Sequence, residues 1–215
     1  MKIDTIFILI QIGIIPALIS IYKILNGEKK YGKLYIYLIV SYIIEIVSNR
    51  LIKLSYFDLS NIIVNTYFLF EVIIIYLIIQ SIINKIKFHI YIIPIILLAW
   101  FIENFINHKI YNSEKYFNSV SSIIEFCICI YGLIYSLNKN YKSFFKEADI
   151  IMILTILFSL SFRLVFEFIY YNYEGNVILM KSISEINNVI NFITNILFIY
   201  CLLCIKNSKK LISLF

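Results

Sequence analysis

The stretch Asn61–Ile83, NIIVNTYFLFEVIIIYLIIQSII, decides the fold because it runs for 23 residues with one charged side chain, Glu71. An α-helix needs about 20 mostly apolar residues to cross roughly 30 Å of hydrocarbon. A membrane-spanning β-strand needs only about 9–11 residues and alternates apolar with polar side chains, which this stretch does not do. The stretch therefore predicts a membrane-spanning helix.

Similar apolar stretches lie on both sides of this one. The chain has 215 residues, of which 61% are hydrophobic and 15% charged, whereas a soluble domain has about 25% charged residues. We expect an all-α polytopic membrane protein, a single transmembrane domain over residues 1–215. Its seven predicted spans are Thr5–Tyr22, Leu34–Ile52, Asn61–Ile83, Ile90–Asn107, Val120–Leu137, Ile150–Tyr171 and Asn187–Ile205.

The segments between the spans exclude several classes of function. None reaches the roughly 50 residues that a folded soluble domain needs, so the chain cannot carry a kinase, nucleotide-binding or DNA-binding module of its own. The formal net charge of +6 is spread over short loops, whereas nucleic-acid binding needs a gathered basic surface. We expect a lipid bilayer as the main partner and no nucleic acid.

The distribution of basic residues predicts the orientation. Of the 19 Lys and Arg residues, 12 follow the first, third, fifth and seventh spans and six lie on the other side. Cytoplasmic loops are enriched in Lys and Arg. The N-terminus is therefore expected outside and the C-terminus in the cytoplasm, with the protein in a bacterial inner (cytoplasmic) membrane.

Polar side chains inside the spans are the candidate functional residues, because charges within a bilayer are costly and usually functional. One glutamate falls in each of the second to sixth spans, and every one lies in the predicted outer half or at its inner limit. Several have polar neighbours at helical spacing, which suggests a shared interior. The predicted ligand-binding residues are Glu45, Asn49, Asn65, Glu71, Glu103, Glu125, Arg163, Glu167, Asn188, Asn191 and Asn195.

Each of these residues also has a simpler explanation. Glutamates near a span end could extend to the headgroups and water, an explanation that fits Glu103 better than the deeper Glu71. Arg163 and Glu167 stand four residues apart on one helix, so they could form a local ion pair or belong to a wider network. Asparagines between membrane helices often only join the helices by hydrogen bonds.

Sequence motifs for enzyme chemistry are scarce. His89 and His108 fall at span ends on opposite sides of the membrane, so they cannot share a metal ion. The Cys201-x-x-Cys204 pair has no second pair or redox motif beside it, and packing is the better explanation for both thiols. We therefore predict no cofactor, no metal site and no assigned catalytic residue, and whether the chain is an enzyme stays open, leaning towards no.

The third and seventh spans begin alike, with Asn61-Ile-Ile-Val-Asn65 and Asn187-Asn-Val-Ile-Asn191. This similarity suggests two parallel three-helix units joined by the fourth span, as in some transporters. The arrangement resembles the three-plus-one-plus-three plan of small sugar transporters, in which asparagines of the third and seventh helices face each other across the pocket. Those transporters rely on prolines in several of their helices, and the chain departs from that family because it has only two prolines.

These patterns favour a small-solute or cation transporter with a polar, carboxylate-lined cavity in the outer half. Five acidic side chains against one arginine favour a small polar or cationic solute as ligand. One alternative is a membrane sensor or accessory subunit that acts through a separate membrane or cytoplasmic protein partner. A second alternative is an intramembrane enzyme that uses glutamates such as Glu45, Glu71 and Glu125 for acid–base chemistry.

Overall fold

The computed structural model describes residues 12–83, 89–106, 110, 116–138, 147–172 and 177–205. Within these residues the chain is entirely helical, with no strand. The elements are α2 (Ile14–Leu25), α3 (Gly32–Lys53), α4 (Phe57–Ile83), α5 (His89–Phe101), the π-helical turn η1 (Ile102–Ile106), α6 (Tyr116–Leu137), α7 (Ala148–Asn172) and α8 (Val177–Cys204). Five of them, α3, α4, α6, α7 and α8, are long and apolar enough to cross a membrane.

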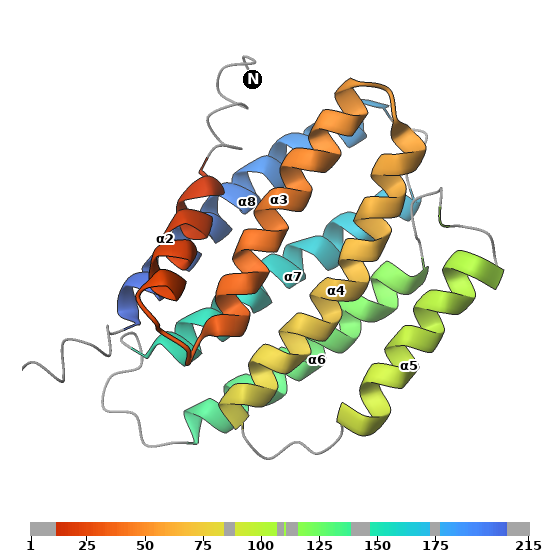
Figure 1. The fold of residues 1–215 in the computed structure, drawn as a ribbon. Helices are drawn as coiled ribbons and strands as arrows, with labels where there is room; N and C mark the ends of the chain where they lie inside the picture. The colour runs from red at the N-terminus through yellow and green to blue at the C-terminus, as the bar shows by residue number, and fades with distance from the viewer. Residues whose placement is uncertain are drawn as a thin grey trace, which may run out of the picture.

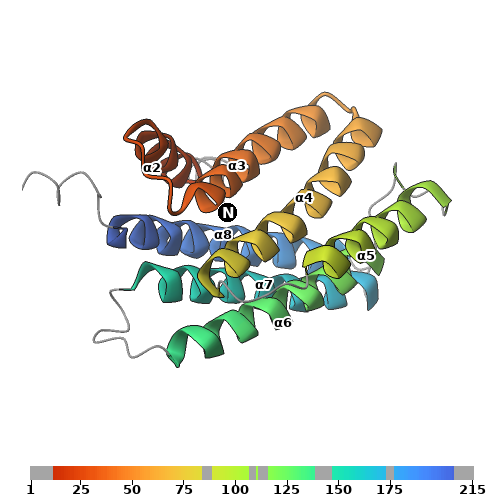
Figure 2. The ribbon, with the colours of Figure 1, turned by 60° about the horizontal axis from the view of Figure 1, so that its bottom comes forward.

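The helices form two layers of three. Helices α2, α3 and α4 make one layer and α6, α7 and α8 make the other, as Figures 1 and 2 show from two directions. The layers join at both sides, where α4 packs on α6 and α2 packs on α8. Six helices therefore form a closed ring, and α5 lies outside it against α4 and α6.

The order around the ring is α2, α3, α4, α6, α7, α8. Within this order α2, α3 and α4 are followed by α6, α7 and α8. The order agrees with two consecutive three-helix units, and the repeat suggested by the similar starts of the third and seventh spans stays a prediction.

Most predicted span boundaries lie within four residues of the observed helix ends, and the start of the seventh span is the large exception. Helix α8 begins at Val177, ten residues before the predicted start at Asn187, because no proline or glycine interrupts this segment and a polar turn at a bundle edge can remain helical. Helix α2 begins at Ile14, so Pro16 lies in its first turn, where a missing N–H removes no helical hydrogen bond. The predicted positions Thr5–Gln11 lie outside the described residues.

The predicted span Ile90–Asn107 is made of two elements. Helix α5 contains Pro94 and ends at Phe101, and η1 continues it to Ile106. Asn107 lies outside the described residues. The wider turn of η1 changes the direction of the side chains after Phe101, and both Glu103 and Asn104 are buried there.

The bundle has two halves of different character. The closed half contains the C-terminal parts of α2, α4, α6 and α8 and the N-terminal parts of α3 and α7, and most of the large buried side chains lie there. Tyr35, Ile79, Ile153 and Leu202 are each fully buried in it. The open half contains the opposite ends of the same helices.

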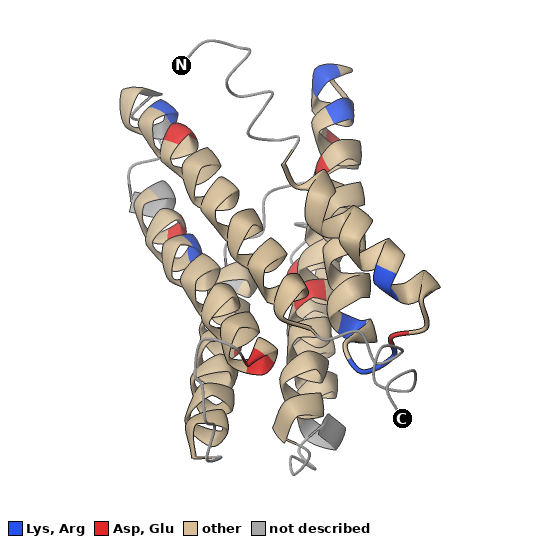
Figure 3. Cartoon of the chain, turned by 90° about the vertical axis from the view of Figure 1, so that its left-hand side faces the viewer, with Lys and Arg blue, Asp and Glu red and all other residues tan. Residues whose placement is uncertain are grey.

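The outward surface is apolar along the middle of the helices. Most charged side chains lie near helix ends, and the long central parts of the ribbon carry few of them (Figure 3). Large apolar side chains project outward on several helices, among them Leu18, Ile95, Val165 and Leu203. Soluble proteins rarely expose apolar surface this extensively, so the surface fits a lipid environment.

Candidate functional site

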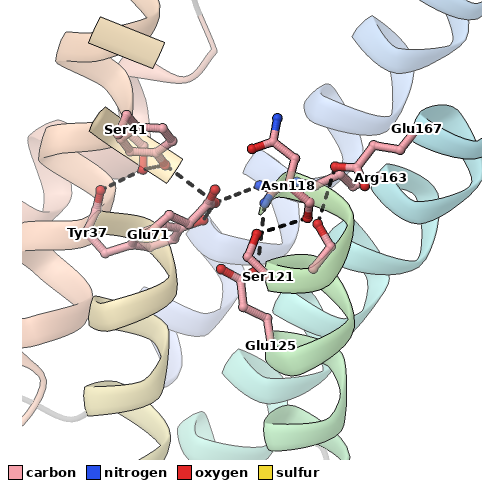
Figure 4. A network of polar contacts seen from close by, with 10 residues as sticks. Tyr37, Ser41, Glu71, Asn118, Ser121, Glu125, Arg163 and Glu167 are labelled. Atoms are coloured by element: carbon pink, nitrogen blue, oxygen red, sulfur yellow. Dashed lines mark hydrogen bonds and ion pairs between the residues drawn. The ribbon is translucent and has the colours of Figure 1, made fainter. Parts of the chain in front are cut away.

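Arg163 lies at the centre of the polar interior. Its position on α7, one turn after Ser159 and one turn before Glu167, directs it toward the facing layer. One guanidinium nitrogen donates to Glu71 Oε1 on α4 at 2.7 Å, and the other lies 3.6 Å from Glu125 Oε2 on α6. Figure 4 shows Glu71 and Arg163 reaching toward each other from opposite layers. The ion pair therefore connects three helices.

A set of hydroxyl groups surrounds Glu71 on its α3 side. Tyr37 donates to Glu71 Oε1 at 3.0 Å, and Tyr67, one turn before Glu71 on α4, donates to the same oxygen at 3.5 Å. The Tyr67 hydroxyl lies 2.6 Å from Ser41 Oγ. Three donors therefore lie within hydrogen-bond distance of Oε1, Arg163 included.

Several buried polar atoms of the site have no hydrogen-bond partner among the described residues. They include Glu71 Oε2, both Glu125 oxygens, Glu167 Oε2 and Asn118 Oδ1. Unpaired buried polar atoms are costly and rare in folded proteins. Their concentration around one guanidinium leaves acceptor capacity that a bound molecule can use.

Two cavities meet at Arg163. The larger has a volume of about 560 Å³ and is lined by α4, α6, α7 and α8, with Asn118, Glu167 and Asn187 among its polar residues. The smaller has a volume of about 240 Å³ and lies between α2, α3, α4, α7 and α8, with Glu45 and Glu71 on its wall. Ser159, Arg163 and Asn191 line both cavities.

The structure brings most of the predicted residues to these cavities. The larger cavity takes Arg163, Glu167 and Asn191, and the smaller takes Glu45, Glu71 and Asn195 in addition to Arg163 and Asn191. Glu125 is buried beside Arg163. Arg163 and Glu167 share a helix face, and the ion pairs of Arg163 extend to other helices, so the wider network is present.

The remaining predicted residues lie elsewhere. Asn49 and Asn188 are half-buried and line neither cavity. Asn65 is buried and donates to the backbone oxygen of Ile110. Glu103 accepts from the backbone N–H of Phe117 at the start of α6, a favourable place for a carboxylate because the first N–H groups of a helix lack partners.

The predicted site residues did not include the tyrosines and the threonine of the smaller cavity. Tyr37, Tyr42, Tyr67 and Thr194 line it together with Phe198. Tyrosine and threonine are common in membrane helices without any site, so composition alone does not select them. Their spacing in the sequence could have identified two of them. Tyr37 and Tyr67 stand one turn before Ser41 and Glu71 respectively, so each pair lies on one helix face.

A second charged pair lies at the end of the closed half. Lys23, at the end of α2, donates to the backbone oxygen of Ile205 after α8 at 2.9 Å, and its Nζ lies 3.4 Å from Glu28 Oε2. Tyr35 on α3 donates to the same Glu28 oxygen at 3.0 Å. Both charged side chains are buried. The predicted first span ends at Tyr22, which placed both residues in the loop that follows it.

Tyr31 precedes α3 at the same end, close to Asp149 at the start of α7. Burial of the phenol and, second, the negative charge of Asp149 raise the pKa of Tyr31 above its ordinary value. The neutral phenol is therefore the favoured form at this end of the bundle. Lys30 lies 3.8 Å from Asp149, so charge is locally balanced there.

The described part of the chain has no group of three His, Cys, Asp or Glu side chains arranged to hold a metal ion. No protein-family model, curated protein or solved structure matches this chain. Functional inference therefore depends on the site itself: one guanidinium and several carboxylates between two cavities, inside a bundle with an apolar exterior.

Proposed function

We propose that this chain is a transporter of small polar or cationic solutes that spans a bacterial cytoplasmic membrane seven times. In this proposal α2 and α5–η1 complete the count beside the five long helices. The loops of the closed half hold most of the basic residues, which favours that half on the cytoplasmic side. The open half, with both cavities, then faces outside.

The observation that supports transport is the position of Arg163 in the wall shared by the two cavities. A solute that moves from one cavity to the other must pass this side chain. Arg163 can exchange partners, because Glu71, Glu125 and Glu167 all surround it while several of their oxygens lack hydrogen bonds. Such an exchange could open the wall when a solute binds.

The balance of charge favours cations. Glu45, Glu71 and Glu167 line the cavities and Glu125 lies beside them, while Arg163 is the one basic residue among the described residues of either lining. Carboxylates in excess attract a positive solute and disfavour an anion. A cation that pairs with Glu71 replaces Arg163, which can then turn to Glu125. Binding and opening are coupled in this way.

The order of helices around the ring adds support. Transporters built from two related three-helix units bind their substrates at the interface between the units. Here the smaller cavity lies between the α2–α3–α4 layer and the α6–α7–α8 layer. Rocking of one layer against the other about Arg163 would expose the cavities alternately to the two sides.

Uptake into proteoliposomes tests this proposal. We expect purified protein to take up labelled methylammonium or choline under an inside-negative potential set with potassium and valinomycin. Glu71→Gln should lower uptake at least tenfold, whereas Asp58→Asn should not, because Asp58 is exposed in the first turn of α4. Uptake equal to that of empty liposomes for both probes would overturn the proposal, as would full uptake by the Glu71 variant.

A further inference from the structure

The smaller cavity has an uncompensated acidic group on its wall. Glu45 projects from α3 into the lining and makes no hydrogen bond or ion pair with any residue that the structure describes. Glu71 and Glu125 already share Arg163. Two acidic residues, Glu45 and Glu71, line the cavity with one arginine, Arg163, which Glu125 beside the cavity also shares. Acidic groups are therefore in excess there.

Two unpaired acceptors lie in the same wall. Glu71 is 2% exposed and its Oε2 has no hydrogen-bond partner, while Thr194 is 7% exposed and its Oγ1 also has none. Both residues line the smaller cavity from opposite layers, α4 and α8. A ligand with N–H donors would satisfy both atoms, whereas a cation without donors would leave them unpaired.

The rest of the lining is aromatic and apolar. Tyr37 and Phe198 meet edge to face at a centroid distance of 6.2 Å, and both line the cavity with Tyr42, Tyr67 and Leu38. Aromatic faces attract cations and alkyl groups alike. The volume of about 240 Å³ compares with roughly 30 Å³ for one water molecule in the liquid, so a short alkyl chain fits.

From these contacts we propose that the smaller cavity binds a small primary alkylammonium ion. Glu45 supplies the counter-charge, Glu71 Oε2 and Thr194 Oγ1 accept hydrogen bonds from the ammonium group, and the aromatic wall covers the alkyl chain. This assignment deepens the transport proposal, on which it rests, because it names the class of solute. It also explains why Glu45 stands apart from the Arg163 network.

Equilibrium binding tests the site without any gradient. Calorimetric titration of the full chain in detergent micelles should show n-butylammonium binding at least tenfold more tightly than tetramethylammonium, an isomeric cation with no N–H donor. Glu45→Gln should weaken butylammonium binding at least tenfold. Asp58→Asn, a matched removal of a carboxylate outside the cavities, should leave the affinity within twofold.

A second variant guards against loss of folding. Thr194→Val conserves shape and removes the unpaired oxygen, so it should weaken butylammonium about tenfold while leaving tetramethylammonium unaffected. Equal affinities for the two isomers, unchanged binding in either variant, or sodium binding as tight as butylammonium would overturn the assignment. Binding without uptake would refute only the transport proposal, and methylammonium or choline uptake without butylammonium binding would refute only this site.

Discussion

The two halves of the bundle contain buried charge in different arrangements. In the closed half, Lys23 faces one carboxylate, Glu28, and also donates to the backbone oxygen of Ile205 after α8. In the open half, Arg163 faces Glu71 and Glu125 at once. Glu71 lines the smaller cavity, and both carboxyl groups have oxygens without a hydrogen-bond partner among the described residues. The closed half therefore pairs one cation with one carboxylate inside packed side chains, whereas the open half pairs one cation with two carboxylates beside a cavity.

This difference teaches how to separate structural from functional charge within one membrane protein. A buried ion pair by itself is weak evidence for either role, because desolvation offsets much of the attraction. A cavity beside the charged groups decides between the roles, because oxygens without a donor among the described residues occur in both halves, Glu28 Oε1 included. By that criterion Lys23 and Glu28 fasten α2, α3 and α8 together, whereas Arg163 and its carboxylates form a site.

The largest effect is expected from Arg163→Gln. The variant leaves Glu71 and Glu125 buried without their cation, and removing one partner of a buried ion pair costs about 3–5 kcal/mol. The free energy of unfolding in detergent should fall by that amount, with little folded protein recovered. Arg50→Gln is the matched control, because Arg50 is exposed near the end of α3.

Neutralising the carboxylates as well tests the cause of this loss. If unpaired charge is responsible, Arg163→Gln combined with Glu71→Gln and Glu125→Gln should recover most of the stability while solute uptake stays absent. A triple variant as unstable as Arg163→Gln alone would show that packing of the guanidinium, and not charge, holds the three helices together.

A smaller loss of stability is expected from Lys23→Met. The variant leaves one buried carboxylate, Glu28, without its cation, whereas Arg163→Gln leaves two. Glu28 also keeps its hydrogen bond from Tyr35, so the cost should fall at the low end of about 3–5 kcal/mol. The melting temperature should fall, while methylammonium uptake per folded molecule should match the wild type. Lys29→Met, at an exposed position in the same loop, should change neither quantity. Reduced uptake in the Lys23 variant would erase the distinction between the two halves.

The sequence was informative where the physics is local. Long apolar runs predicted all five long helices, because a helix that crosses hydrocarbon needs a length and an apolar composition that can be counted in the sequence. The same applies to Glu71 and Arg163, whose depth in an apolar run predicted a buried role. Helix ends were less predictable: α8 extends ten residues before Asn187 because nothing in that polar segment terminates a helix.

The pairing of residues between helices was not predictable. Tyr37 and Glu71 are 34 positions apart and Arg163 and Glu71 are 92 apart, so their contacts depend on how the layers face each other. Lys23 and Glu28 were assigned to a loop because they follow the first apolar run. Their burial depends on the end of α8, which is remote in the sequence.

The smallest effect is expected from Gly132→Ala, which tests how tightly the closed half is packed. A Cβ at Gly132 on α6 would lie 2.8 Å from Ile79 Cγ2 on α4, and Ile79 is fully buried, so the two helices must separate slightly. Overpacking of this kind costs about 1–3 kcal/mol, of which the better helix propensity of alanine returns about 1.

Gly32→Ala on α3 is the matched control, because nothing lies within 4 Å of the added atom. We expect the melting temperature of the Gly132 variant to fall and that of the Gly32 variant to hold or rise. Equal melting temperatures would mean that the closed half accommodates an added methyl group without cost. The closed half would then not be more tightly packed than the open half, and the contrast between the two halves would fail.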